Sequence, residues 1–400
     1  MVDKPRFIHF VVDDKFIPDS IRCFQDAGLT TNKFFYLTEN PTAVSFLRNT
    51  IVECVNIRQI GVIIENLKQD DVVVLHCLYA LPAELVCKIP RNVKVIWYAW
   101  GFDLYGNEYP IKPLLEVGEE KLKPMTKSKV RWMIWLKEAL RRYRVLTETK
   151  GYLTKSASVQ YTAIARVDFF AGVFASEHKL LQDNCEYYHA KRVTHNYIHP
   201  EEFSLKEIEK PQSITGNNIL LGNSASYLCN HIDIIHALYN QTRDHSYNIY
   251  CPLSYGGNSF YVNSVVKEGK RLFGDRFKPL LDYLPLNEYT KIIQSCGSIV
   301  LGYQRQAATC NCLTSMWNGL KLFLPANSMN YSEYKKVEGL KVFSIENDLN
   351  DDSLRLDMKT CLKKQREIIN SLYSYERWVI DLRDSLDIIL GRCSLGNNEN

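Results

Sequence analysis

The first half of the chain alternates short apolar runs with amphipathic stretches. A helical pattern near residues 20–27 separates the first two of these runs. Apolar strands separated by helices are typical of parallel strands whose two faces are both covered. The apolar runs of this half span residues 6–12, 33–38, 60–67, 71–78, 93–100, 165–176 and 190–198. The pattern therefore predicts an α/β domain built on a parallel sheet.

A polar stretch at residues 204–218 interrupts this alternation with Pro211 and Gly216, as an interdomain linker would. The alternation then starts again, and from Asp351 to about Leu390 the apolar spacing is helical. Five further strands, each followed by a helix, are predicted at 218–224, 247–256, 277–285, 297–305 and 320–328. Two α/β halves joined by one linker predict two Rossmann-like domains.

We therefore expect an N-terminal domain over residues 1–205, with a basic and aromatic insertion near 106–150, and a C-terminal domain over 218–345. Helices over 346–393 follow, and packing back on the N-terminal domain is one arrangement open to them. Open parallel sheets bind ligands at the carboxyl ends of their strands, so a ligand is expected in a cleft between the two domains.

Composition agrees with a globular protein of two domains. With 400 residues the chain is too long for one core, and with 46% hydrophobic residues it is too apolar to be disordered. No apolar stretch has the length of a membrane span, and Asp13 and Asp14 occupy positions where a secretory signal needs small residues. The 12 cysteines form no CxxC pair and no zinc spacing. We expect a cytoplasmic protein with reduced thiols and no metal site.

The stretch GNS, residues 222–224, follows an apolar strand and precedes an amphipathic helix. Gly222 permits a tight turn, while Asn223 and Ser224 place backbone N–H groups before a helix start, where phosphate binds well. An ordinary capped helix is the alternative interpretation, since Asn and Ser are common capping residues.

The loops after the next strands of the same half are also polar or aromatic. Arg305 could neutralise a diphosphate, or be a plain surface charge, and Thr309 and Asn311 would precede a helix starting near Leu313. Because several such loops would converge on one cleft, a nucleotide pocket is better supported by the loops together than by any one of them. The predicted donor-binding residues are Gly222, Asn223, Ser224, Tyr250, Pro252, Tyr255, Asp282, Arg305, Gln306, Thr309 and Asn311. Among these, Tyr250, Pro252, Tyr255 and Asp282 would frame the nucleoside.

Four sequence blocks are distinctive: WYAWGFDLY (97–105), LLGNSASYLCNHIDIIHAL (220–238), YCPLSYGGNSFYVNSVVKEG (250–269) and the block over 284–328. Together they resemble glycosyltransferase family 56, the family of the TDP-N-acetylfucosamine:lipid II N-acetylfucosaminyltransferase of enterobacterial common antigen synthesis. The resemblance is clear from about residue 215 to about residue 330 and poor in 106–150 and past 345.

The resemblance implies the GT-B fold, in which two Rossmann-like domains face each other across a cleft, with C-terminal helices. It implies that the C-terminal half mainly holds a nucleotide-diphospho-sugar, while the N-terminal half presents a polyprenyl-diphosphate-linked acceptor. It also implies no essential metal and no other cofactor. After Arg305 and Gln306 this chain reads AATCNC, which departs from the family pattern and leaves the donor sugar open.

On the acceptor side, a transferase needs a group that receives a proton or stabilises an oxocarbenium-like transition state. Asp103 follows a strand and a glycine, so it is the first candidate, and His76, at the end of another strand, is the second. His9 is the third. A helix-capping role for Asp103, and hydrogen-bonded core positions for the two histidines, are the structural alternatives.

Residues 121–146 interleave cations with apolar and aromatic side chains, and 121–150 holds ten Lys or Arg against two Glu. This pattern favours a helix lying on an anionic membrane surface, although a solvated amphipathic helix is the alternative. The residues predicted to face the membrane or the acceptor are Trp132, Trp135, Arg141 and Arg142. No nucleic-acid-binding motif is present.

Together with these residues, the resemblance implies a metal-independent glycosyltransferase of surface polysaccharide synthesis. It would move an acetamido- or amino-deoxyhexose, such as 4-acetamido-4,6-dideoxygalactose, from a dTDP- or UDP-sugar to a polyprenyl-diphosphate-linked oligosaccharide. It would work as a peripheral protein on the cytoplasmic face of the inner membrane. A UDP-sugar 2-epimerase-like enzyme and a non-catalytic nucleotide-binding membrane scaffold are the alternatives.

Overall fold

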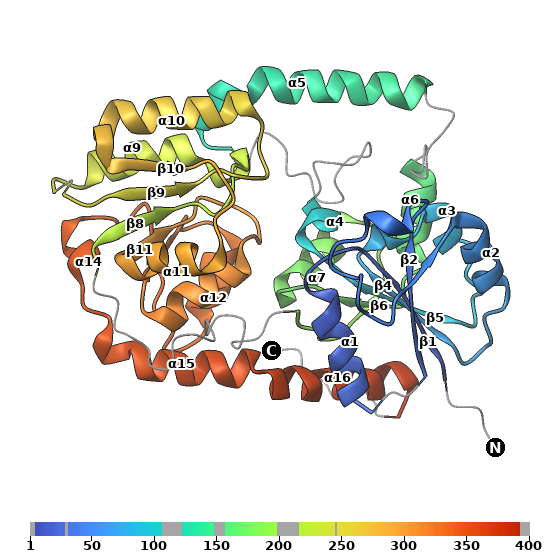
Figure 1. Cartoon of the computed structure of the whole chain (residues 1–400). Helices are drawn as coiled ribbons and strands as arrows, with labels where there is room; N and C mark the ends of the chain where they lie inside the picture. The colour runs from blue at the N-terminus through green and yellow to red at the C-terminus, as the bar shows by residue number, and fades with distance from the viewer. Residues whose placement is uncertain are drawn as a thin grey trace. The chain divides into compact units, whose positions relative to one another are not determined.

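The computed structural model describes residues 5–28, 31–105, 122–147, 157–197, 216–244 and 246–392. The chain divides into two compact units. Unit 1 comprises Met1–Glu116, Arg141–Ile198 and Tyr375–Asn400, and unit 2 comprises Val117–Leu140 and His199–Ser374. Each unit has a parallel sheet of its own with helices around it (Figure 1).

In its described part, unit 1 has a seven-stranded parallel sheet with the order β3-β2-β1-β4-β5-β6-β7. The central strands β1 and β4 are buried along their whole length, as expected for strands covered on both faces. The strands are β1 (Phe7–Val11), β2 (Asn32–Leu37), β3 (Glu53–Val55), β4 (Val72–His76), β5 (Lys94–Tyr98), β6 (Phe169–Ala171) and β7 (Lys191–Arg192).

Helices connect these strands, and α16 closes unit 1 by packing against α1. The helices are α1 (Ile17–Asp26), α2 (Ile57–Glu65), α3 (Ala83–Val86), α4 (Gly101–Tyr105), α6 (Ala157–Ala165), α7 (Ala175–Asn184) and α16 (Tyr375–Leu390), with short 3-10 turns at Pro41–Ala43 and Leu78–Ala80.

The apolar run 60–67 is not a strand, because Ile57–Glu65 form α2. The Asn56 side chain accepts hydrogen bonds from the backbone N–H groups of Arg58 and Gln59, and the Gln59 side chain accepts one from the Asn56 N–H. This reciprocal capping box fixes a helix start. The other apolar runs of the first half each contain a strand, although the run at 165–176 keeps only three residues in β6.

In its described part, unit 2 has a six-stranded parallel sheet with the order β10-β9-β8-β11-β12-β13. The five strands predicted for this half are confirmed, and a two-residue strand, β13, follows them. The strands are β8 (Asn218–Leu221), β9 (Ile249–Pro252), β10 (Phe277–Leu280), β11 (Cys296–Val300), β12 (Lys321–Leu324) and β13 (Phe343–Ser344).

In unit 2, α9 packs against α10, and α12 packs against α15 (Figure 1). The helices are α9 (His231–Gln241), α10 (Ser259–Phe273), α11 (Leu286–Ser295), α12 (Thr309–Asn318), α13 (Met329–Lys336), α14 (Asp351–Arg355) and α15 (Lys359–Tyr373), with 3-10 turns at Tyr227–Cys229 and Gly274–Arg276. Helix α5 (Pro124–Thr147) is grouped with unit 2 up to Leu140.

The unit boundaries differ from the predicted domain boundaries in two places. Residues 117–140, expected in an insertion of the N-terminal domain, are grouped with unit 2. The C-terminal helices divide at Tyr375, so α15 belongs to unit 2 while α16 belongs to unit 1. Most of the predicted linker lies outside the described residues. No helix within the described ranges is long and apolar enough to span a membrane.

Candidate functional site

The strand order of unit 2 points to the loops after β8 and β11. The order in which strands are added to the sheet changes side between these two parallel neighbours. β9 and β10 follow β8 on one side, while β12 and β13 follow β11 on the other. In open parallel sheets, ligands bind at the carboxyl ends of the two strands that flank such a change of side. The two loops that flank it begin at Gly222 and Leu301, after β8 and β11 respectively.

The turn after β8 requires glycine at position 222. Gly222 has a φ of +75°, and its N–H donates to the Val300 carbonyl at 2.9 Å. A Cβ at this position would lie 2.6 Å from Nε2 of His231. His231 is the first residue of α9, its Nδ1 lies 3.0 Å from the Tyr261 hydroxyl, and burial lowers its pKa to about 4. A neutral imidazole therefore fills the space beneath the turn.

Tyr303, on the loop after β11, joins the two loops. Its hydroxyl donates to Oδ1 of Asn223 at 2.8 Å and lies 3.3 Å from Oγ of Ser224. Tyr303 is buried, and desolvation holds its pKa well above the ordinary value, so the hydroxyl stays protonated. Tyr303 lies at the end of the apolar run 297–305, and no role was predicted for it from the sequence.

The loop between Tyr303 and α12 is held by side-chain contacts. Nη1 of Arg305 donates to the Gln306 carbonyl at 2.7 Å, and Nε2 of Gln306 donates to Oγ1 of Thr309 at 2.7 Å. Ala308 has a φ of +54°, and α12 begins at the next residue. The helix therefore starts at Thr309 rather than near Leu313 as predicted, and Asn311 lies within its first turn.

A second residue that the sequence analysis missed, Asn330, supports this loop from α13. Its Nδ2 donates to the Ala307 carbonyl at 2.7 Å, and the Asn330 side chain is buried. Because Ala307 precedes the left-handed residue Ala308, this contact helps to fix the geometry at the start of α12. A pairing between residues so far apart in sequence has no local signal.

The four residues predicted to frame a nucleoside are less closely grouped. The Tyr255 carbonyl accepts from Ala225 N–H at 2.7 Å, and the Tyr255 side chain is exposed, so it lies beside the turn after β8. Pro252 is the buried last residue of β9. Tyr250 lies inside β9, opposite Leu220 of β8. Asp282 is exposed in the loop after β10. Of the four, Tyr255 is the one that the structure brings to the Asn223 turn.

The electrostatics of the two central loops favour an anion. Residues 222–230 and 301–309 contain no acidic residue and include Arg305. The N-cap residues of α9 and α12 form no side-chain hydrogen bond with the first turns that follow them. Helix N-termini carry partial positive charge and N–H groups that lack intrahelical acceptors. This arrangement can bind a phosphate or diphosphate.

On unit 1, Asp103 is buried, with 1% of its surface exposed. Its carboxylate accepts hydrogen bonds from Leu78 N–H at 2.9 Å, Trp97 Nε1 at 2.6 Å and Trp100 N–H at 2.7 Å. Burial raises its pKa to about 7, and these donors oppose the rise. In unit 1 the carboxylate thus links the start of α4 to the loop after β4, as the helix-capping alternative predicted.

His76 and His9 also lie in the interior of unit 1. His9 Nδ1 is 3.0 Å from His76 Nε2, and His76 Nδ1 is 2.7 Å from the Tyr197 hydroxyl. His195 stacks on Tyr98 with ring centroids 3.9 Å apart. Burial lowers the pKa of each of the three histidines. We call His9, His76 and His195 the histidine cluster; its contacts match the hydrogen-bonded core alternative.

The residues predicted to face a membrane lie on α5. Trp132 and Trp135 are exposed. The backbone of Arg141 and Arg142 is helical, but the side chains of both residues lie outside the described part of the structure. The described residues contain no group of three or more His, Cys, Asp or Glu side chains placed to hold a metal ion.

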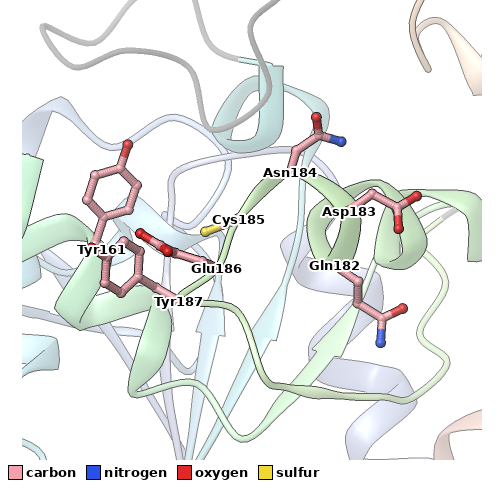
Figure 2. Close-up of a pocket in the computed structure, with 7 residues that line it drawn as sticks. All are labelled: Tyr161, Gln182, Asp183, Asn184, Cys185, Glu186 and Tyr187. Carbon is pink, nitrogen blue, oxygen red and sulfur yellow. The ribbon is translucent and has the colours of Figure 1, made fainter.

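Unit 1 also has a surface pocket beside the end of α7 (Figure 2). Its lining includes Tyr161 and Tyr187, whose rings stack 4.8 Å apart, together with the acidic residues Asp183 and Glu186. No predicted site residue lines this pocket, and no cation does. Its charge is unsuited to a diphosphate, so the loops of unit 2 are the stronger candidate site.

Comparisons with solved structures identify the fold. The N-terminal domain of trehalose-6-phosphate phosphatase from Candida albicans is 10% identical, with a TM-score of 0.62 and coverage of 98% of this chain and 97% of that chain. A glycosyltransferase from Rickettsia africae is 10% identical, with a TM-score of 0.61 and coverage of 98% and 100%. Anabaena HepE, in complex with UDP and glucose, is 9% identical, with a TM-score of 0.59 and coverage of 96% and 100%. These likenesses confirm the predicted GT-B fold.

The sequence itself identifies the family. No curated protein matches the chain. The family model described as 4-alpha-L-fucosyltransferase, glycosyl transferase group 56, matches residues 125–378, which is more than half of the chain. The resemblance predicted from the sequence blocks is confirmed. The chain belongs to glycosyltransferase family 56 and is a glycosyltransferase with the GT-B fold.

Proposed function

We propose that this glycosyltransferase takes its sugar from a nucleoside diphosphate donor and that unit 2 binds this donor. The observation that carries the proposal is that α9 and α12 begin at the ends of two neighbouring loops, 222–230 and 301–309, which include Arg305 and no acidic residue. A nucleoside diphosphate leaving group is a concentrated negative charge, and fixed donors aimed at it stabilise the transition state as that charge develops. In this proposal the protein supplies the positive charge, and transfer requires no metal.

The diphosphate would lie between the turn after β8 and the start of α12. Asn223 and Ser224 would contact it from one side, while Arg305, Gln306, Thr309 and Asn311 would approach from the other. Gly222 would keep the turn free of a side chain. Tyr303 holds Asn223 and Ser224 in place before the donor arrives, which reduces the ordering cost of binding.

The nucleoside would lie along the loops after β9 and β10. The exposed Tyr255 ring offers a stacking surface beside Asn223, and Tyr250, Pro252 and Asp282 would complete its surroundings. UDP is bound by HepE, whose fold this chain shares. We therefore propose UDP or dTDP as the nucleotide.

The family supports a finer proposal for the substrates. The transferred sugar would be an acetamido- or amino-deoxyhexose such as 4-acetamido-4,6-dideoxygalactose. The acceptor would be a polyprenyl-diphosphate-linked oligosaccharide of surface polysaccharide synthesis, reached by a peripheral protein on the cytoplasmic face of the inner membrane. No catalytic base is proposed on unit 1, because Asp103 and His76 both lie in its interior. Family membership favours transfer over epimerisation and over a scaffold role.

A thermal-shift titration with dTDP, UDP, GDP, CDP and ADP tests the donor site. We expect one pyrimidine diphosphate to stabilise the protein by about 2.7 kcal/mol at roughly 100 times its dissociation constant. Arg305→Ala should remove most of this stabilisation. Arg271→Ala is the matched control, because Arg271 is an exposed arginine of unit 2 that pairs with Glu268. Equal stabilisation of wild type and Arg305→Ala would contradict the proposal.

Replacing Tyr303 by phenylalanine tests the support of the turn. The variant keeps the buried ring but loses the hydroxyl that bonds Asn223 and Ser224. We expect the KM for the donor to rise by about 5- to 20-fold, corresponding to roughly 1–2 kcal/mol for lost hydrogen bonds, with little change in kcat at saturating donor. Steady-state kinetics with a sugar nucleotide would measure this split. A fall in kcat at unchanged KM would assign Tyr303 to the chemical step instead.

A further inference from the structure

Helix α5 has one buried face and one face that is unusually apolar for an exposed surface. Thr126, Val130 and Met133 are buried and recur at helical spacing, so they form the face packed on unit 2. The opposite side exposes Trp132 by 51% and Trp135 by 68%. Two large aromatic side chains exposed one turn apart on the same helix are typical of a surface that binds a partner.

Helix α10 extends this surface. Phe260, in the first turn of α10, is 46% exposed and meets Trp132 edge to face, with ring centroids 5.2 Å apart and planes at 89°. Nδ2 of Asn258, the N-cap of α10, lies 3.2 Å from Sδ of Met133 on the buried face of α5. The exposed aromatic surface therefore includes residues of two helices, α5 and the start of α10, that contact each other through these side chains.

Cations accompany these aromatic residues. Lys129 and Arg131 are exposed within one turn of Trp132. The whole of α5 contains seven Lys or Arg and one Glu. Cations beside exposed tryptophans match the chemistry of an anionic lipid surface, where rings enter the headgroup boundary while cations pair with phosphates. A protein partner would need an acidic, concave counterpart instead.

The start of α5 is fixed to the candidate donor site. The Asp233 carboxylate of α9 accepts hydrogen bonds from Met125 N–H at 3.0 Å and Thr126 N–H at 2.7 Å, so it caps the first turn of α5. Asn230 accepts from Lys123 N–H at 2.8 Å and donates to the Gly302 carbonyl at 2.9 Å. Gly302 precedes Tyr303, so α5 begins beside the loops proposed to bind the donor.

We propose that Trp132, Trp135, Leu136 and Phe260, flanked by Lys129 and Arg131, form a lipid-contact surface by which unit 2 binds an anionic phospholipid bilayer. The inference rests on the proposed function, since a lipid-linked acceptor gives this surface its purpose. It deepens that function by assigning membrane contact to the same unit that carries the donor loops. Binding would be interfacial, because no described helix can span a bilayer.

Co-sedimentation of the full chain with phospholipid vesicles tests the lipid-contact surface. We expect the wild type to bind vesicles rich in phosphatidylglycerol and to bind pure phosphatidylcholine vesicles weakly, with binding reduced by added salt. Replacing both Trp132 and Trp135 by serine should lower the partition coefficient at least about tenfold. Phe46→Ser is the matched control, because Phe46 is 51% exposed on unit 1, and it should bind as the wild type does.

Charge variants separate the contribution of the cations to vesicle binding from that of the aromatic residues. Lys129→Glu with Arg131→Glu should lower binding to phosphatidylglycerol vesicles about tenfold or more. Lys363→Glu with Lys335→Glu, which reverses two exposed cations elsewhere on unit 2, should change it by less than about threefold. Wild-type binding of the double serine variant, or an equal loss in either control, would overturn the proposal. The proposal would also be overturned if the double serine variant changed from dimer to monomer in sedimentation velocity and still bound vesicles. The surface would then contact a second copy of the chain.

The same variants keep this inference distinct from the donor proposal. The double serine variant should retain full stabilisation by the nucleotide that stabilises the wild type. If the wild type binds vesicles but no nucleotide stabilises it, the proposed function is contradicted while the lipid-contact surface is supported. A nucleotide effect without vesicle binding by the wild type would do the reverse.

Discussion

Replacing Asp103 by alanine is expected to lower the free energy of unfolding by about 3–5 kcal/mol, a large effect for a single carboxylate. The variant leaves the N–H groups of Leu78 and Trp100 and Nε1 of Trp97 without their acceptor. Each buried, unpaired donor costs about 1–3 kcal/mol. Relief of the carboxylate's own burial offsets part of this sum, as the rise of its pKa to about 7 indicates.

Thermal and urea unfolding monitored by circular dichroism would measure the loss. Asp282→Ala is the matched control, because Asp282 is exposed in a loop and should shift the melting temperature little. Measuring both melting temperature and transfer activity of Asp103→Ala distinguishes a structural role of Asp103 from a catalytic one. If Asp103→Ala melts within about a degree of the wild type while transfer falls by about a hundredfold or more, the catalytic interpretation of Asp103 would be restored.

Most strands of the two sheets could be predicted because they lie in mainly apolar runs, whereas the short strands β3 and β13 were not predicted. β1 and β4 are buried at every position and are apolar except for one histidine each, so each leaves a nearly continuous apolar signal in the sequence. The run at 60–67 was assigned wrongly because a short apolar stretch fits a buried strand and a helix equally well. Asn56 and Gln59, spaced as a capping box just before it, are the local signal that could have identified α2.

The candidate site could be predicted only in part. Gly222, Asn223 and Ser224 stand out locally because a strand, a glycine and a helix start follow one another. Tyr303 and Asn330 carry no such signal, since their partners are 80 and 23 residues away in sequence. Asp103 was predicted as an acceptor-side group because it follows a strand and a glycine, and its contact with the N–H of Leu78, which is 25 residues away, could not be inferred from that local pattern.

The grouping of α5 with unit 2 could not be predicted from the sequence either. Its basic and aromatic composition predicted an amphipathic helix, and the structure contains one. Its assignment to unit 2 depends on Asn230 and Asp233, which lie 107 or 108 residues beyond their partners near the start of α5. Contacts across such separations follow from the fold and cannot be inferred from the helix pattern alone.

Acidification is expected to destabilise unit 1 steeply because of the histidine cluster. Burial lowers the pKa of His9 from 6.5 to about 3 and those of His76 and His195 well below 6.5. The folded unit therefore keeps the three rings neutral where the unfolded chain protonates them. Their contribution is fully present above about pH 6.5 and is lost progressively as the pH falls below it.

Asp103 opposes this trend, because its pKa is raised to about 7 and the folded state binds its proton first. Counting the histidine cluster and Asp103 alone, the unfolded state binds up to about two protons more than the folded state between about pH 6 and 5, which gives a loss of up to roughly 2–3 kcal/mol per pH unit. Urea unfolding followed by circular dichroism across this range would measure the slope. His195→Phe keeps an aromatic ring against Tyr98 and should reduce the slope by about one proton, or 1.4 kcal/mol per pH unit. An unchanged slope in this variant would show that the acid sensitivity arises outside the histidine cluster.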